Sequence, residues 1–576
     1  MDTNTYLIEK VLNGNLLVTV LVTLTATLST VINGLIVGRE LGSDALVAFG
    51  LASPMLILLS ALAGVFGNGG TIRCAKHIGA GDKTKVTANF TVTLVTTLLV
   101  GVIYTLFCII CSDFIADLFG ATGNIREMTS SYIRGVGLST IPFLLLQNLM
   151  LYLRMDDGQK LTMIAMVVTV AVSALSAYLS STQTSLGLFG ISLSVMIGSV
   201  AGLIVTLPHF RKKDRMLGFG SIRGTGKELK EVCMAGLPTA INRGSQTLKN
   251  FALNSFLLSF SGTAAVLALS VQTNVYQFLI AISTGYGLMV AMMCGIFYGE
   301  KDKRAIVDTI KVTMKSGFII STIVGIVLFI LAEPVASLFI CDGGDLSMAT
   351  DCLRMFALSQ PTSTLCLILL YMYQSMGNIV LSTVISVTRG VGYVVLFSFV
   401  LAPLIGVNGV WISFFLADIF SIFTIMAVIK IKTGTFPIHC KDFILVPESD
   451  FDAKIICDIS LRNDMSEVMK LSDRISGMCL ENGVDEDKAN RIALCIEEMA
   501  GNVVEHAFTD NKEHFMDIRI VLKGQDLIFR MRDNGTRFNP LTADTEGHFG
   551  LKVIRATAKS IDYCYSVKLN NLTVTV

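Results

Sequence analysis

Long apolar runs are the feature of this 576-residue sequence that most restricts its fold. A helix that spans a membrane needs about 20 predominantly apolar residues. Runs of that kind recur at 16–38, 46–69, 88–111, 133–153, 161–180, 187–208, 233–260, 264–297, 307–332, 353–375, 380–402 and 408–430. The pattern predicts an all-α polytopic membrane protein with twelve spanning helices. Because twelve is even, we expect both termini on the same side of the bilayer.

Charged residues are scarce and unevenly distributed. Only 15% of the residues are charged and 52% are apolar, whereas a soluble protein carries roughly 25% charged residues. The first 440 residues hold 28 Lys and Arg against 21 Asp and Glu, and residues 441–576 hold 17 against 23. The composition excludes a soluble, disordered or nucleic-acid-binding protein. It indicates a basic body in the lipid bilayer, joined to an acidic, charge-rich tail.

The basic residues of the body gather in the loops that follow even-numbered runs. They are Arg73, Lys76, Lys83, Lys85, Arg154, Lys160, Arg211, Lys212, Lys213, Arg215, Arg223, Lys227, Lys230, Lys301, Lys303, Arg304 and Lys311. Cytoplasmic loops of membrane proteins collect Lys and Arg. We therefore expect a multi-pass protein of the plasma (inner) membrane with both termini and the acidic tail in the cytosol.

The two halves of the body repeat each other. The letters GAGDK at Gly79–Lys83 match GEKDK at Gly299–Lys303 after a shift of 220. GLFG at Gly187–Gly190 matches GVNG at Gly406–Gly409 after a shift of 219. Parallel repeats of six helices suit a two-lobed transporter with the substrate path between the lobes. We expect a six-helix N-lobe at 1–215 and a six-helix C-lobe at 216–432.

The body resembles the multidrug and toxic compound extrusion (MATE) transporters over about residues 10–432. The resemblance is carried, in this order, by VINGLIVGRELGSDALVAFGLASP from Val31, IGAGD from Ile78, LRMDDGQ from Leu153 and AGLPTAIN from Ala235. It implies secondary-active antiport, in which small organic molecules, often cationic, are exported in exchange for inward Na⁺ or H⁺.

Five polar residues are candidates for the transport path. Members of the family commonly carry acids in the first and seventh helices, where this chain has Asn33 and Gln246. Ionisable side chains inside a bilayer are costly and therefore candidates for function. Arg243 and Lys249 either line the path, where they would repel a cationic substrate, or they snorkel toward the membrane surface or serve in packing of the lobes. Asp418 either holds the coupling ion or proton, or pairs with a cation of its lobe.

The tail has the pattern of a soluble α+β domain. A linker at 433–452 precedes it, and the domain occupies 453–576. Periodicity predicts a strand at 454–460, helices at 463–482 and 485–508, paired strands with a turn at Gly524–Gln525, a helix near 551–560, and two strands from Ile561 and Leu572 joined by Asn570–Asn571. Asn463 is the expected cap of the first helix.

Three clusters in the tail carry chemistry. Glu498 and Asn502 lie one helical turn apart, where a carboxylate can orient water and an amide can ligate Mg²⁺. The sequence RDNGTRFNP places Asp533 and Gly535 at a strand end, where the Asp can accept a hydrogen bond from an adenine amino group. GHFGLKVIR from Gly547 enters a helix whose N-terminal amides suit phosphate.

These clusters, in this order, resemble the Bergerat (GHKL) ATP-binding fold over about 453–576, and the closest branch is the anti-sigma-factor serine kinases. The resemblance implies ATP and Mg²⁺ as cofactors and a cytosolic anti-anti-sigma-like (STAS) regulator as partner. Its implied site residues are Glu498 as general base, Asn502 as Mg²⁺ ligand, Asp533 and Gly535 at adenine, Gly547 and Gly550 at the phosphate lid, and Thr573 in the last strand. His548 stands where this branch usually has Gly.

Two functions remain open at this point. One is a secondary transporter whose ATP-binding tail regulates it. The other is a membrane-tethered serine/threonine kinase or anti-sigma-like signalling protein that uses the body as sensor, so the tail is either an ATPase, a protein kinase or a nucleotide-binding switch. In both cases the charge distribution predicts that the basic loop with Arg211, Lys212, Lys213 and Arg215 docks the acidic tail.

Overall fold

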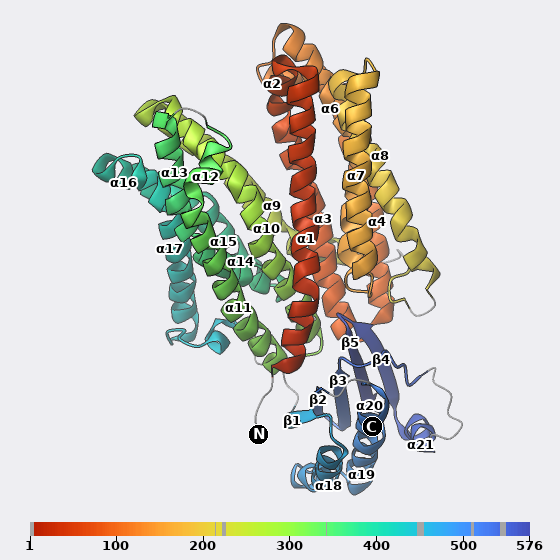
Figure 1. Ribbon diagram of the computed structural model, residues 1–576. Helices are drawn as coiled ribbons and strands as arrows, with labels where there is room; N and C mark the ends of the chain where they lie inside the picture. Colours follow the sequence, from red (N-terminus) through yellow and green to blue (C-terminus); the bar gives the residue numbers. More distant parts are fainter. Residues whose placement is uncertain are drawn as a thin grey trace.

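The computed structural model describes residues 5–212, 215–221, 226–340, 343–445, 454–508, 512–541 and 549–576. A long helical bundle carries a smaller domain with a β-sheet at one end (Figure 1). The expected fold class, a helical membrane body followed by an α+β domain, is confirmed. We call the end of the bundle that meets the sheet the docked end.

Within the described residues, each half of the bundle contains six long helical segments. The N-lobe consists of α1 (Tyr6–Ile36), α2 (Ser43–Leu51) with α3 (Ser53–Gly79), α4 (Lys83–Ile110), α5 (Ser112–Leu118), α6 (Gly123–Leu153), α7 (Gln159–Gln183) and α8 (Gly187–Thr206). The C-lobe consists of α9 (Gly226–Ser261), α10 (Thr263–Gly299), α11 (Lys303–Ile330), α12 (Ala332–Ser337), α13 (Gly343–Leu358) with α14 (Gln360–Ser375), α15 (Ile379–Val387) with α16 (Tyr393–Ile405), and α17 (Asn408–Thr433). The long segments correspond one by one to the twelve apolar runs.

Length and hydropathy allow most of these segments to cross a membrane. In the part of the chain that the structure describes, nine helices pass that test, and the bent pair α13–α14, with an angle of 48° at its break, makes a tenth. The other two long helices are α1 and α9.

The internal repeat is visible in the backbone as well as in the letters. Gly42 and Gly262, 220 residues apart, both precede a helix with positive φ, 84° and 78°. Asp82 and Asp302, also 220 apart, cap α4 and α11, and each accepts a hydrogen bond of 3.0 Å from the N–H three residues on. Positive φ is disfavoured for residues with a Cβ, which explains why the repeat retains glycine at the first pair.

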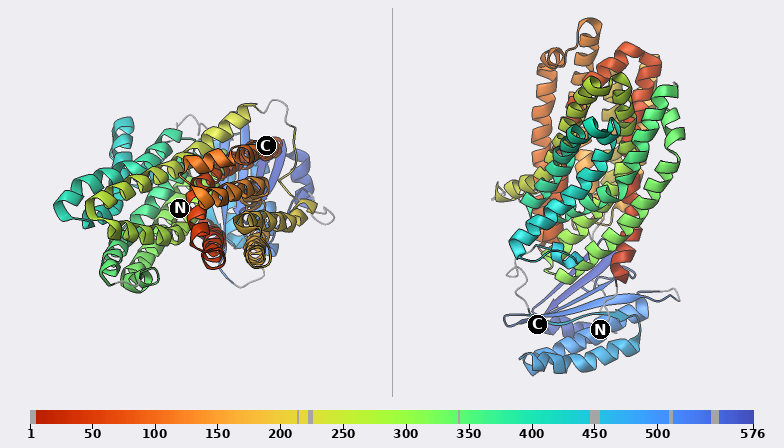
Figure 2. Two further views of the ribbon diagram at one scale, coloured as in Figure 1. Left: turned by 90° about the horizontal axis from the view of Figure 1, so that it is seen from above. Right: turned by 90° about the vertical axis from the view of Figure 1, so that its left-hand side faces the viewer.

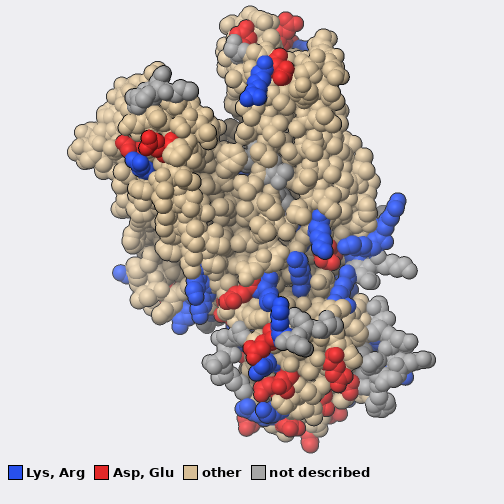
Figure 3. Space-filling model, in the orientation of Figure 1, with Lys and Arg blue, Asp and Glu red and all other residues tan. Residues whose placement is uncertain are grey.

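The two lobes touch at the docked end through backbone contacts. A Cβ on Gly79 of α3 would lie 1.9 Å from the Ile296 carbonyl oxygen of α10, and a Cβ on Gly299 would lie 2.1 Å from that of Lys76. A shift of 220 converts one contact into the other, so the same contact occurs twice about the pseudo-twofold axis. At the opposite end the lobes diverge and leave a hollow between them (Figure 3).

The tail forms a five-stranded antiparallel sheet in the order β1–β2–β3–β5–β4. Its strands are β1 (Lys454–Arg462), β2 (Phe515–Lys523), β3 (Asp526–Asp533), β4 (Ser560–Ser566) and β5 (Leu569–Thr575). Its helices are α18 (Met465–Glu481), α19 (Glu486–Cys495), α20 (Gly501–His506) and α21 (Phe549–Thr557). Helices cover one face of the sheet, where Ile518, Phe529 and Val574 form the core, and the other face turns toward the bundle (Figures 1 and 2).

Two local details of the tail differ from the sequence prediction. Asp464 rather than Asn463 caps α18, because its side chain accepts a hydrogen bond from the Ser466 N–H at 2.8 Å. The last turn lies at Val567–Lys568, where φ is 50° and 65°, rather than at Asn570–Asn571. β5 therefore begins three residues earlier than predicted, and both asparagines belong to the strand.

The sheet docks on the bundle through buried ion pairs. Arg532 of β3 binds Glu300 and Asp302 in the loop between α10 and α11, with 2.9 Å to the Asp302 carboxylate. Arg519 of β2 lies 2.8 Å from the same Asp302. Burying a charge without a partner is costly. The carboxylates of this loop therefore require the arginines of the sheet beside them.

The polarity of this contact is opposite to the one expected from net charge. Of the basic residues at 211–215, the three that the structure describes are exposed and form no ion pair with the tail, and Lys213 lies outside the described residues. That loop instead reaches the tail through Met216, whose sulfur lies 3.1 Å from the Cys564 sulfur. The expectation failed because a domain with net negative charge can still carry arginines on the one face that binds.

Replacing Arg532 with Gln should loosen the docked domain, because Glu300 and Asp302 lose a buried cation. Removing one partner of a buried ion pair typically costs about 3–5 kcal/mol, so hydrogen–deuterium exchange in Gly299–Lys303 and in β3 should accelerate. R462Q is the matched control, since Arg462 pairs with Glu513 on the exposed surface, where ion pairs contribute little. Exchange in R532Q that equals the wild type would show that this arginine does not hold the domain.

Docking should also depend on pH through Asp517 of β2. Burial on the docked face raises the pKa of its carboxyl to about 7, and the nearby Asp302 and Asp458 raise it further, against the hydrogen bond from Ser460 and the charge of Arg304. On an undocked sheet this face would meet water, where the pKa of an Asp is about 3.9. The docked state thus binds a proton that the undocked state lacks between about pH 4 and 7.

The sign follows from this difference. Docking should strengthen as the pH falls from 7 toward 4, and should not depend on Asp517 above that range. We expect docking at pH 6 to be roughly tenfold more favourable than at pH 8, measured by the same exchange experiment. D517N should remain docked at both pH values. A pH response that persists in D517N would have to come from another group, such as Asp458, whose pKa burial also raises.

Candidate functional site

The helix that carries Glu498 and Asn502 is not a regular α-helix. A π-helical turn at Ile496–Ala500 separates α19 from α20 and contains Glu498, whereas Asn502 lies in α20. Such turns occur frequently at functional sites. Glu497 accepts a hydrogen bond of 2.6 Å from the Ser472 hydroxyl of α18, which attaches this turn to the neighbouring helix. Glu498 is the half-buried acid beside it.

The DNG segment packs against the end of α20. Asp533, the last residue of β3, is only 2% exposed and accepts hydrogen bonds from the Gly535 N–H at 2.9 Å and from Asn570 Nδ2 at 2.8 Å. Burial raises the pKa of Asp533, while these two hydrogen bonds lower it. A Cβ on Gly535 would lie 2.4 Å from the Ala507 Cβ. The structure thus brings Asp533 and Gly535 next to the helix of Asn502.

The polar groups of this region fit a nucleotide. Asn502 Nδ2 and Asn534 Oδ1 are buried and have no hydrogen-bond partner among the described residues. Most buried polar atoms in proteins are paired, and a nucleotide offers phosphate oxygens and amino hydrogens to both. For Mg²⁺, the described residues hold no cluster of three His, Cys, Asp or Glu. Asn502 would be the protein ligand, with phosphate and water oxygens completing the shell.

Thr573 does not belong to this site, contrary to the sequence prediction. It pairs with Arg530 and Asp562 on the sheet face that turns toward the bundle, whereas the residues on either side of it enter the helix-side core. Side chains alternate between the faces of a strand, so Thr573 points away from the nucleotide motifs. Asn570 takes its place beside Asp533. The sequence already shows this alternation, because residues 572, 574 and 576 are apolar and so predict that Thr573 lies on the opposite face of the strand from the core.

The predicted phosphate lid is described only in part. Gly547 and His548 lie outside the described residues, and Gly550 lies in the first turn of α21. The roles of both glycines in binding phosphate stay predictions.

Of the five candidate path residues, one lies in α1 and three lie in α9, namely Asn33 and then Arg243, Gln246 and Lys249. Asn33 of α1 is buried, and its Oδ1 atom has no hydrogen-bond partner among the described residues. Gln246 of α9 donates to Asn242 one turn earlier, at 2.9 Å, and Arg243 is exposed. Neither Asn33 nor Gln246 carries a charge that could bind a coupling cation by itself.

Asp418, which is buried, forms a charged group in the C-lobe with the half-buried side chains of Arg389 and Lys249. Arg389 donates from Nε to Asp418 at 2.7 Å. The Lys249 ammonium lies 5.0 Å from the centre of the Phe414 ring, an arrangement that favours a cation. Asp418 was expected either to hold a coupling ion or proton or to pair with a cation of its lobe. In the structure it pairs with Arg389 of the same lobe. The group thus contains two basic side chains and one carboxylate, and only Arg389 of the two is paired with that carboxylate in the structure.

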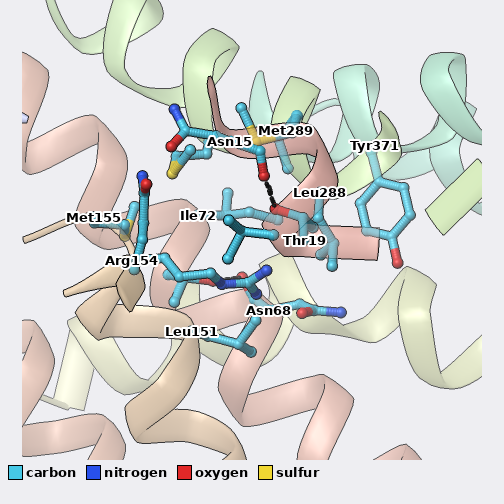
Figure 4. Close-up of a pocket in the computed structure, with 15 residues that line it drawn as sticks. Asn15, Thr19, Asn68, Ile72, Leu151, Arg154, Met155, Leu288, Met289 and Tyr371 are labelled. Atoms are coloured by element: carbon cyan, nitrogen blue, oxygen red, sulfur yellow. Dashed lines mark hydrogen bonds between the residues drawn. The ribbon is translucent and has the colours of Figure 1, made fainter. Parts of the chain in front are cut away.

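A cavity lies between the lobes in the docked half of the bundle, where the repeat predicts the substrate path, but the residues that line it were not predicted. Its wall includes Asn15, Thr19, Asn68, Arg154 and Gln159 from the N-lobe and Met289 and Tyr371 from the C-lobe (Figure 4). In the sequence, Arg154 is one loop cation among many. No local pattern indicates that it faces the opposite lobe, because the cavity is assembled from helices far apart in the chain.

Comparison with known proteins agrees with this architecture. The MatE family model matches residues 19–201 and 238–404, and the model of the histidine kinase-like ATPase domain matches residues 461–576. The multidrug export protein MepA of Staphylococcus saprophyticus is 24% identical over 381 residues, which are 65% of this chain and 83% of that protein. The probable multidrug resistance protein YoeA of Bacillus subtilis is 24% identical over 392 residues, 66% and 84% of the two chains.

Solved structures share the fold of the bundle. A multidrug resistance MATE family transporter of the MOP superfamily in an outward-facing conformation aligns with a TM-score of 0.68 at 21% identity, covering 72% of this chain and 94% of that one. A MOP superfamily transporter from Pyrococcus furiosus, described as having a binding pocket of reverse polarity, aligns with a TM-score of 0.67 at 20% identity, covering 75% and 100%. The chain therefore belongs to the MatE family and ends in a histidine kinase-like ATPase domain.

Proposed function

We propose that this chain is a secondary-active transporter that exports small organic molecules and is regulated by ATP binding to its C-terminal domain. Export is supported by relatives that are named multidrug export proteins. Two lobes that touch at one end and diverge at the other also suit alternating access. The observation that carries the regulatory part is a pair of consecutive residues at the end of β3, Arg532 and Asp533.

These two residues connect the nucleotide site to the contact between the lobes. Neighbours on a strand point to opposite faces, so Arg532 reaches Glu300 and Asp302 while Asp533 faces the nucleotide motifs. The loop that Arg532 binds follows directly on Gly299, whose backbone packs against the other lobe. A change at Asp533 on nucleotide binding would therefore move a strand end that holds this loop.

The charge distribution supports a cytosolic position for the docked end. Lys and Arg of the bundle gather there, above the sheet (Figure 3). The positive-inside rule then places the docked end and the ATP-binding domain in the cytosol, with the bundle in the plasma (inner) membrane. ATP would reach the domain from that compartment.

Within the ATP site we assign roles that follow the motif order. Asp533 would accept a hydrogen bond from the adenine amino group, Asn502 would hold Mg²⁺, and Glu498 would orient a water and accept its proton. Gly547 and Gly550 would frame the phosphates. Bound Mg²⁺ would neutralise phosphate charge. Recognition of adenine and activation of water would be carried out by the side chains named above.

A membrane-tethered signalling protein is the second candidate. In that case the domain would act as a serine kinase or an anti-sigma-like binder of a STAS-type regulator, with the bundle as sensor. The observation that favours it is the commitment of Asp418 to Arg389, because a paired carboxylate is poorly suited to take up Na⁺ or H⁺ as coupling ion. The two candidates differ in whether an ion gradient moves an organic molecule.

The full-length protein should bind ATP in the presence of Mg²⁺. D533A should weaken ATP binding roughly 5- to 150-fold, since a lost partner in a buried hydrogen bond costs about 1–3 kcal/mol. E498A should keep ATP affinity and lose turnover. Titration calorimetry and phosphate release would measure both, with E505Q, an exposed residue near the same helix end, as control. Wild-type affinity in D533A would mean that adenine is read elsewhere.

In proteoliposomes, efflux of ethidium or carboxyfluorescein should respond to a Na⁺ or H⁺ gradient without ATP. ATP should change the rate in the wild type but not in R532Q, whose ATP affinity should stay intact because Arg532 points away from the nucleotide. R462Q should retain the ATP effect. If export required ATP and ignored both gradients, the secondary-transport proposal would fail, and the absence of any export would favour the signalling candidate.

A further inference from the structure

We propose that the cavity between the lobes binds the carboxylate or phosphate group of a small organic anion, with Arg154 as the cation that recognises it. This inference rests on the proposed function in one respect, because it names the substrate class of the transporter. The binding step itself needs no transport. The argument depends on the isolation of Arg154, on the other groups of the wall, and on the position of the cavity across both lobes.

Arg154 is a buried cation without a counter-ion. It follows the last residue of α6, is 8% exposed, and has no hydrogen bond or ion pair with any described residue. Burial lowers the pKa of its guanidinium to about 10, so the group remains charged at neutral pH. A buried charge normally has a partner in the protein. Here the guanidinium extends across the cavity toward Asn68 of α3 (Figure 4).

The rest of the wall combines apolar side chains with several amide and hydroxyl groups, and among the described residues it contains no acid. Among the described residues that line the cavity there is no Asp or Glu to neutralise Arg154. Asn68, Thr71 and Gln159 line it, and the Gln159 Oε1 and Asn15 Oδ1 atoms are buried without a hydrogen-bond partner. A guanidinium binds carboxylate and phosphate groups through two parallel hydrogen bonds. The amide and hydroxyl groups would serve a hydroxyl or amino group on the same ligand.

The cavity also has a position that suits a substrate. Both lobes contribute to it, Arg154 and Asn15 from one side and Met289 and Tyr371 from the other. A bound anion would contact both lobes and so favour the arrangement in which they touch at the docked end. The two basic side chains of Lys249 and Arg389 in the C-lobe, distant in sequence from Arg154, add a second element that disfavours cations.

The test is direct binding to the full-length protein in an uncharged detergent. L-malate and inorganic phosphate are the probes, and malamide, which lacks the charge, is the uncharged comparison. We expect saturable binding of at least one anion and none of malamide. R154Q should weaken binding at least tenfold, and R154K should retain part of it, because Lys cannot form the paired hydrogen bonds. K160Q, an exposed cation in the same loop region, should bind as the wild type does.

Two further arms keep the result decisive. If R154Q does not fold, Q159E is measured instead. Its carboxylate in the cavity wall would pair with Arg154 and should abolish anion binding. In nanodiscs, phosphatidylglycerol should not compete with malate, whereas competition would assign the site to a lipid headgroup and overturn the substrate proposal. Absence of binding in the wild type, or unchanged binding in R154Q or Q159E, would also overturn it. Anion binding without export would leave this inference intact and refute only the proposed transport.

Discussion

The carboxylates of Glu300 and Asp302 are buried between the bundle and the sheet, and this burial is possible only with cations beside them. Arg532 and Arg519 supply those cations from neighbouring strands. The requirement determines which face of the sheet meets the bundle, because apolar residues at the opposite parity of β2 and β3, such as Ile518 and Phe529, belong to the helix-side core. It also determines where the domain sits, since the loop with the two carboxylates directly follows the close approach of Gly299 to the other lobe.

This arrangement relates three parts of the molecule that the chain keeps apart. The nucleotide motifs lie on one face of the sheet, the docking arginines on the other, and the contact between the lobes lies one loop away. The repeat contributes a similar loop on the N-lobe side at Gly79–Lys83, with the same glycine contact and the same capping Asp. Among the described residues, only the C-lobe copy carries an acid, Glu300, that pairs with the sheet, so the C-terminal domain engages the two pseudo-symmetric loops unequally. Regulation by ATP, as proposed here, would therefore act first on the C-lobe.

Much of the arrangement of the candidate nucleotide site could be predicted from the sequence, because its motifs are short and their order is informative. Asp533 and Gly535 meet the end of the helix of Asn502 as expected. Thr573 was assigned wrongly and Asn570 was missed, since the turn was placed three residues too late and the strand alternation was not applied. In the bundle, the roles of Asn33 and Gln246 in the transport path stay predictions. The pairing of Asp418 with Arg389 could not be predicted, because helical periodicity does not specify which side chains of two helices meet.

By itself the sequence determined the number of long helices, the two-lobed repeat, the change to a soluble α+β domain and the order of the nucleotide motifs. These properties depend on local composition, on the periodicity of apolar residues and on the spacing of motifs, all of which can be read directly from the sequence. Only the tertiary structure decided that the sheet docks through arginines against acids, that Asn570 stands beside Asp533, and that Arg154 faces a cavity without a counter-ion. Each of these depends on which side chains of distant segments come together, and the energy of a buried charge is set by those neighbours rather than by its own position in the sequence.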